Sequence, residues 1–282
     1  MELQTVYISR ALALAGVKVI MINRKEEQEN ADADVEWKHC DMGSLKEVKQ
    51  VFSELRNSLG RLDFLILSAG INTNFYNEDA DGIDRHFGIN YLGHFYVCNQ
   101  LWLLLRKTGE MGTKPAPRVI FESSEMHRTA PPDVHFASMD EINDSSMDPM
   151  RLYGRTKLAM ILCAKFGLHG RVIKPNGDNI YAITQQWKDA YPGITGELLS
   201  NAMLFAGRSV KQGSYSALWA ATSDEIEEKD MNGFYFSDPG QPGKETAQAS
   251  DEKLGAALWD LSERIIMDKL GSDALVDWRA EE

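Results

Sequence analysis

The sequence predicts an α/β fold, in which helices cover both faces of a doubly wound, mostly parallel sheet. Short apolar runs of strand length alternate with amphipathic helical segments along nearly the whole chain. Such alternation joins parallel strands through right-handed helical crossovers. Some runs are apolar at almost every position, as in VKVIMIN at residues 17–23, which is typical of strands buried on both faces.

Each element has its own signal. Apolar residues recur at helical spacing over residues 3–15, and Gly16 then ends the helix. Ser44 and Glu47 have the spacing of a capping box at the start of the next helix. The same criteria predict strands over residues 17–23, 35–42, 62–70, 118–124, 179–184 and 233–237, and helices over residues 44–60, 82–107, 150–168, from about 195, 215–222 and 254–270.

Composition excludes several classes of function. The chain has 30 Lys and Arg residues against 42 Asp and Glu residues, a formal charge of -12, which repels nucleic acid and anionic membrane surfaces. No window approaches the roughly 18 apolar residues of a membrane span, and the first residues lack the pattern of a secretory signal. We therefore expect one domain over residues 1–282, with no nucleic-acid partner and no membrane span.

The three cysteines, Cys40, Cys98 and Cys163, are far apart in the sequence. No Cys or His spacing is typical of a metal site, so we predict no metal. Free buried thiols are expected in a reducing compartment, which favours a cytoplasmic protein.

The sharpest local pattern is YGRTK at residues 153–157. Positions i and i+4 share one face of a helix, so the phenol of Tyr153 and the ammonium of Lys157 are expected to reach one site. A nearby positive charge favours the phenolate and makes the tyrosine a usable proton donor near neutral pH. Because Tyr-x-x-x-Lys is common, the motif needs support from its surroundings.

That support comes from a strand that ends in Ser123 and Ser124, before the helix. Open parallel sheets place their sites at the carboxyl ends of strands, where a serine can hydrogen-bond a substrate carbonyl. A serine pair that only begins a loop is the alternative.

These features resemble the short-chain dehydrogenase/reductase superfamily, and in detail its retinol-dehydrogenase-like and WW-domain-oxidoreductase-like branch, whose fold is Rossmann-like. LILSAG at residues 65–70 is similar to the family's Asn-Asn-Ala-Gly strand end, INYLGHF carries Asn90 at the family's helix asparagine, and Asp41 matches the aspartate near the adenine ring. The resemblance implies cofactor contacts at Asp41, Ser68, Ala69 and Gly70.

The resemblance also implies roles for the catalytic group. Tyr153 is expected to be the general acid/base, Lys157 to lower its pKa and hold the nicotinamide ribose, Ser124 to orient the substrate carbonyl, and Asn90 to support a water relay. If the match to the family is displaced by one residue, Ser123 takes the role given to Ser124. Arg24 occupies the place where this branch carries an arginine for a 2′-phosphate, which favours NADP(H) over NAD(H); a solvated loop charge is the alternative.

The chain departs from the family in two places. The family's first strand and its TGxxxGxG turn, which binds phosphates at a helix N-terminus, have no counterpart here, so we expect a sheet without its first strand and doubtful cofactor binding. Three arrangements are open for the two strands that flank the place of the missing strand. They pair with each other, another segment fills the space between them, or the region is loosened. After residue 184 the family's Pro-Gly-Thr loop is also missing, and Tyr191, Pro192, Gly193 and Thr195 are a weak substitute.

The resemblance favours an NADP(H)-dependent oxidoreductase that interconverts an alcohol and a carbonyl on a small lipophilic substrate. A noncatalytic scaffold or binding protein and a related isomerase are the alternatives. Five aromatic and methionine side chains either line a substrate pocket or pack in the core. They are Met126, Phe136, Met139, Trp187 and Met203. Four apolar side chains of the helix with the YGRTK motif either form a homodimer contact or pack on the sheet. They are Leu158, Ile161, Leu162 and Phe166.

Overall fold

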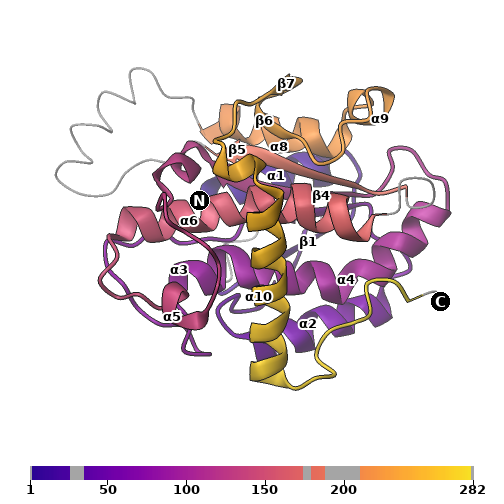
Figure 1. The fold of residues 1–282 in the computed structure, drawn as a ribbon. Helices are drawn as coiled ribbons and strands as arrows, with labels where there is room; N and C mark the ends of the chain where they lie inside the picture. The colour runs from indigo at the N-terminus through magenta and orange to yellow at the C-terminus, as the bar shows by residue number, and fades with distance from the viewer. Residues whose placement is uncertain (1, 26–34, 174–178, 188–209, 281–282) are drawn as a thin grey trace.

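The computed structural model describes residues 2–25, 35–173, 179–187 and 210–280 (Figure 1). Its strands are β1 (Val19–Asn23), β2 (Val35–His39), β3 (Phe64–Leu67), β4 (Arg118–Ser124), β5 (Tyr181–Trp187), β6 (Tyr235–Asp238) and β7 (Gln241–Pro242). Its α-helices are α1 (Glu2–Leu14), α2 (Leu45–Ser58), α3 (Arg85–Phe87), α4 (Gly93–Glu110), α5 (Met139–Ile142), α6 (Pro149–Leu162), α8 (Val210–Thr222), α9 (Glu225–Glu228) and α10 (Glu252–Leu270). Two π-helical turns, η1 (Gly88–Leu92) and η3 (Cys163–Val172), and two 3-10 turns, η2 (Glu125–Thr129) and η4 (Gln248–Ser250), complete the elements.

The sheet is mostly parallel, which confirms the predicted fold class. Strands β3, β4, β5 and β6 pair in parallel in that order, and the short β7 joins β6 in antiparallel fashion. The interior strand β4, between β3 and β5, is buried along its whole length, as expected for a strand with helices on both faces.

The strands are divided between two sheets. Strands β1 and β2 pair in parallel only with each other, in a sheet separate from the five-stranded one. A cavity of about 130 Å³ is lined by Ile22 and Asn23 of β1, by residues 40–42 after β2 and by residues 68–71 after β3. Of the three outcomes expected for the gap, closure of the neighbouring strands onto each other is thus excluded within the residues that the structure describes.

Two layers of helices cover the sheets. Helix α1 packs against α8, and α8 contacts β4 and β5 on one face. Helix α2 packs against α4, α6 packs on β4, and α10 crosses outside α6 and α2 on the other face (Figure 1). Gly16 follows α1 with a φ of +85°, a left-handed conformation that glycine adopts without strain.

Two predicted helices are less regular than their patterns suggest. The helix expected over residues 82–107 is a capped turn, a π-helical turn and then α4, while the helix expected over residues 150–168 is α-helical only to Leu162 and continues as η3. The strand expected to end at Thr184 runs on to Trp187, and the strand expected over residues 35–42 ends at His39. The helix expected from about residue 195 falls outside the described residues, as do Tyr191, Pro192, Gly193 and Thr195.

The prediction of free, buried cysteines is confirmed in the described part of the chain. No helix there is long and apolar enough to cross a membrane. Cys40, Cys98 and Cys163 are free and buried, and no group of metal-ligating side chains occurs among the residues searched.

Candidate active site

Helix α6 carries the two residues of the predicted proton-transfer pair. The Asp148 carboxylate caps its N-terminus by accepting a hydrogen bond from Met150 N at 2.9 Å, and Pro149 fits the first turn. One turn apart, Lys157 Nζ lies 5.3 Å from the centroid of the Tyr153 ring, and both side chains are buried. Tyrosine and ammonium therefore share one buried site, where a positive charge favours the phenolate.

Two hydrogen bonds hold helix α6 against strand β4. Lys157 Nζ donates to Glu122 O at 2.8 Å, and Ser123 Oγ donates to Lys157 O at 2.7 Å. Ser123 is thus occupied in packing the helix. Ser124 ends the strand and accepts from Met126 N at 3.1 Å through its Oγ, so it stands at the carboxyl end of β4 as the sequence predicts.

Gly154 lets the turn after Ser124 approach α6. A Cβ at this position would stand 2.3 Å from Thr129 Oγ1, 2.7 Å from Met126 O and 2.9 Å from Ala130 N. No side chain fits there without moving backbone. The glycine of YGRTK therefore sets the distance between the helix with Tyr153 and the turn that Ser124 begins.

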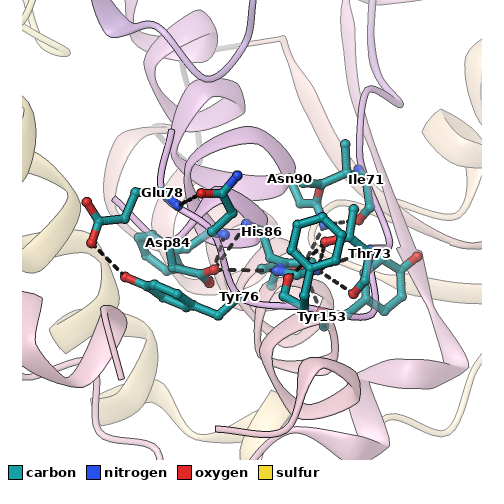
Figure 2. A network of polar contacts seen from close by, with 12 residues as sticks. Ile71, Thr73, Tyr76, Glu78, Asp84, His86, Asn90 and Tyr153 are labelled. Carbon is teal, nitrogen blue, oxygen red and sulfur yellow. Dashed lines mark hydrogen bonds and ion pairs between the residues drawn. The ribbon is translucent and has the colours of Figure 1, made fainter. Parts of the chain in front are cut away.

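Asn90 joins the segment after β3 to α6 (Figure 2). It lies in the π-helical turn η1, accepts from Ile71 N at 2.7 Å through Oδ1, and donates to Ile71 O at 2.9 Å through Nδ2. The same Nδ2 donates to Thr156 Oγ1 at 3.3 Å, and that hydroxyl donates to Tyr153 O at 2.7 Å. Asn90 thus reaches the catalytic helix, and its part in a water relay stays a prediction.

Five of the six residues predicted for the cofactor line the cavity between the two sheets, whereas the sixth, Lys157, is not among its lining residues. Arg24, Asp41, Ser68, Ala69 and Gly70 all border it, together with Thr5 and Lys25 from α1 and the end of β1. Arg24 Nη1 lies 3.8 Å from Asp41 Oδ2, and the two side chains are 43% and 32% exposed. Such an exposed pair contributes little stability, so Arg24 is available to an anionic ligand. Arg24 and Lys25 thus place two cationic side chains beside Asp41 in the lining of this cavity.

The motifs did not reveal the buried ionisable groups around Lys157. Burial raises the pKa of Glu122 to about 7, although Lys157 opposes this. Burial, aided by Lys157, lowers the pKa of His94 to about 3. Glu122 Oε1 and both amide atoms of Gln185, its register partner on β5, are buried without a hydrogen-bond partner among the described residues. A glutamate inside the apolar run RVIFESS was the one available signal.

The predicted pocket and dimer residues mostly belong to the core. Met126 and Phe136 are buried, and Met139 packs against the main core. Leu158, Ile161 and Leu162 are buried in the same core, and Phe166 packs against it. Packing within the chain accounts for these side chains, and it was the alternative left open for both sets. Met203 and the side chain of Trp187 lie outside the described residues.

Known proteins resemble this chain at a distance. The family model described as Enoyl-(Acyl carrier protein) reductase matches residues 6–113. Human polyprenol dehydrogenase is 26% identical over 87% of the chain, human retinol dehydrogenase 14 is 27% identical over 81%, and the WW domain-containing oxidoreductase of Gallus gallus is 29% identical over 93%. The chain spans 73%, 66% and 65% of the length of these relatives, respectively.

Solved structures support the fold. An uncharacterized protein from Mycobacterium Paratuberculosis superposes with a TM-score of 0.67 at 24% identity, covering 94% of this chain and 89% of its own. The NADH-dependent reductase A1-R′ complexed with NAD superposes with a TM-score of 0.57 at 15% identity, covering 84% of this chain and 91% of its own. The solved structures support the α/β fold alone. In sequence, the chain resembles the short-chain dehydrogenase/reductase superfamily, and its distant relatives include retinol dehydrogenase 14 and WW domain-containing oxidoreductases.

Proposed function

We propose that the chain is an NADP(H)-dependent oxidoreductase that interconverts an alcohol and a carbonyl on a small lipophilic molecule. The observation that carries the proposal is the buried pair on α6, where the ammonium of Lys157 lies 5.3 Å from the ring centroid of Tyr153. Helix α6, which carries the pair, packs on β4 and on the turn η2 that follows Ser124. It thus lies at the carboxyl end of β4, the edge where open parallel sheets place their ligands.

The residues divide the chemistry between them. Tyr153 gives a proton to the oxygen of a carbonyl substrate, or takes one from an alcohol, and Lys157 lowers the free energy of its phenolate. Ser124 donates a hydrogen bond to the same substrate oxygen as negative charge develops on it. A bound nicotinamide supplies or accepts the hydride. Lys157 and the residues that border the cavity, Arg24, Asp41 and Ser68–Gly70, would hold that cofactor.

The choice of NADP(H) rests on charge at the cavity. Arg24 and Lys25 line it after β1, at the position where an acidic residue would accept a ribose 2′-hydroxyl and an arginine accepts a 2′-phosphate. A lipophilic substrate is supported by the relatives, whose names specify polyprenol and retinol. Free buried thiols at all three cysteines support a place in the reducing cytoplasm.

A noncatalytic scaffold is the second candidate, because the catalytic group is enclosed. Tyr153 has an exposed fraction of 0% and Ser124 of 1%, so a substrate reaches them only after the surrounding segments move. An enclosed tyrosine and serine of this kind also suit a protein that keeps the fold and binds a partner without turnover.

Cofactor binding and turnover separate the two candidates. We expect NADPH to raise the melting temperature of the purified chain in a concentration-dependent way, because a ligand that binds only the folded state stabilises it, and NADH to do so less. Tyr153→Phe should then abolish NADPH-dependent reduction of a lipophilic aldehyde while leaving the NADPH-induced shift intact. Tyr215→Phe, at a tyrosine on α8 that is 49% exposed, is the matched control and should behave like the unmodified chain.

A melting temperature that stays unchanged at millimolar NADPH favours the scaffold. Turnover that survives Tyr153→Phe removes the proposed proton donor even if the cofactor binds.

A further inference from the structure

A fully buried ion pair joins α6 to the segment before α4. Arg155 Nη2 lies 3.1 Å from Asp84 Oδ2, and both side chains have an exposed fraction of 0%. The guanidinium also donates to Glu141 O from Nη1 and to Ile142 O from Nη2, both at 2.7 Å. Arg155 stands between Tyr153 and Lys157 in the YGRTK motif, so this contact is made from the middle of the catalytic helix.

Asp84 fixes the other side of the contact (Figure 2). Its carboxylate caps α3 by accepting from His86 N and Phe87 N, each at 3.3 Å. The ring of His86 lies 3.4 Å from the same carboxylate through Nδ1 and 3.2 Å from Thr73 Oγ1 through Nε2. The chain of contacts thus runs from Arg155 to Thr73, three residues after Gly70 of the cofactor cavity.

Asn90 provides a second link between the same two parts. It holds Ile71 by both backbone groups and contacts Thr156, the neighbour of Arg155. Two polar links, one charged and one neutral, therefore tie the segment after β3 to adjacent residues of α6.

Stability alone does not explain a buried pair of charges. Removing two charges from water is costly, and apolar side chains of similar volume often stabilise a protein as well or better. The charged pair fixes the orientation of α6. The planar guanidinium can bind Asp84, Glu141 O and Ile142 O together in only one orientation of this helix.

We propose that Arg155 and Asp84 are positioning residues for the reaction. Their ion pair sets the rotation and height of α6, so that Tyr153 and Lys157 face the segment that follows Ser68–Gly70 at the edge of the cofactor cavity. The proposal rests on the proposed oxidoreductase function and assigns no contact with substrate to either residue.

The test replaces the whole pair and separates geometry from stability. In Arg155→Met with Asp84→Leu, we expect a melting temperature close to that of the unmodified chain, the same Kd for NADPH, and a kcat lower by about 100-fold, the loss typical of a misplacement near 1 Å. The matched control is Arg171→Met with Asp260→Leu, at a surface pair 2.7 Å apart whose side chains are 35% and 62% exposed; its kcat should not change. An unchanged kcat in the Arg155 and Asp84 double variant overturns the proposal.

Arg155→Lys covers the case in which the double variant does not fold. It keeps the positive charge, but a single ammonium cannot reproduce the planar arrangement of three acceptors, so we expect a folded chain with kcat reduced by roughly ten-fold and KM unchanged. Unchanged kcat in Arg155→Lys also contradicts a positioning role.

Hydrogen exchange distinguishes failure of this inference from failure of the proposed function. Backbone amides of residues 71–74 and 84–87 should exchange faster in Arg155→Lys than in the unmodified chain, whether or not the chain turns over any substrate. Faster exchange in a chain without reductase activity rejects the proposed function and retains only the part of this inference that concerns structure, in which the pair holds α6 against the segment after β3. Unchanged exchange rejects the positioning role.

Discussion

The charge state of Glu122 depends on its burial in the fold. The side chain is 4% exposed, and burial raises its pKa to about 7 from the ordinary value of 4.5. The folded chain therefore keeps this proton over a pH range in which the unfolded chain has released it. Its stabilising contribution is complete below pH 4.5 and is lost as the pH rises to about 7.

Glu122→Gln should remove this pH dependence. The two pKa values differ by about 2.5 pH units, so the free energy of unfolding of the variant, relative to the unmodified chain, should increase by up to about 3 kcal/mol between pH 4.5 and pH 8. Urea denaturation at the two pH values measures it. Glu54→Gln, on the exposed side of α2, is the control, and an equal difference between Glu122→Gln and the unmodified chain at both pH values would disprove the assignment.

The sequence predicted that Tyr153 and Lys157 share one site, but it did not predict the residues that support this site. Tyr153 and Lys157 are four positions apart, so helical spacing alone predicted their shared site. Arg155 and Asp84 are 71 positions apart, and no local pattern pairs them. In the sequence, each resembles an ordinary surface charge, but in the structure both side chains are buried.

Among the elements, α6 shows how a glycine sets the geometry of a site. Glycine inside a helix costs about 1 kcal/mol relative to alanine, yet Gly154 occurs in the second turn of α6. The turn η2 explains it, because a Cβ at Gly154 would stand 2.7 Å from Met126 O and 2.9 Å from Ala130 N. The close approach of two backbones outweighs helix propensity here.

Gly154→Ala should therefore destabilise the chain despite the gain in helix propensity. We expect a loss of about 1 to 2 kcal/mol, in the range for an overpacked contact, together with reduced turnover because Ser124 moves with its turn away from Tyr153. Urea denaturation and steady-state kinetics measure the two effects. The control is Gly60→Ala, where a Cβ meets no atom within 4 Å; a Gly154→Ala chain as stable and active as this control would contradict the packing argument.

The sequence predicted the elements well where the pattern is local. The apolar run of β4 and the capping box of α2 predicted those elements because each signal lies within a few residues of the structure it specifies. The π-helical turns η1 and η3 were missed. Close tertiary contacts occur in these turns: a Cβ placed at Gly167 of η3 would stand 2.5 Å from Trp259 Cε3. Helical periodicity does not contain such contacts.

At the scale of the whole molecule, the division of the sheet is the feature that the sequence left open. An absent strand was inferred from the resemblance, but the arrangement of its neighbours depends on packing between distant segments. The structure leaves β1 and β2 as a separate pair, tied to the rest through α1, whose Thr5 Oγ1 lies 3.2 Å from Ser68 Oγ.

This division predicts unequal stability across the molecule. A two-stranded sheet is marginal alone, and the residues of β1 are only half-buried whereas those of β4 are all buried. Backbone amides of β1 and β2 should therefore exchange with solvent faster than those of β4 and β5, through local opening that leaves the larger sheet intact. Hydrogen exchange followed by mass spectrometry of peptides over residues 19–23, 35–39 and 118–124 measures the difference.

Cofactor binding should reduce this inequality. Arg24 and Asp41 lie at the ends of β1 and β2, while Ser68, Ala69 and Gly70 follow β3, and all five border one cavity. A ligand that contacts both sides favours the closed state of β1 and β2 by mass action, so saturating NADPH should slow exchange in residues 19–23 and 35–39 far more than in residues 118–124. Arg24→Ala should weaken this protection for NADPH more than for NADH, because only NADPH presents a 2′-phosphate to the guanidinium. Equal slowing in all three segments would mean that the ligand does not bind across the division of the sheet.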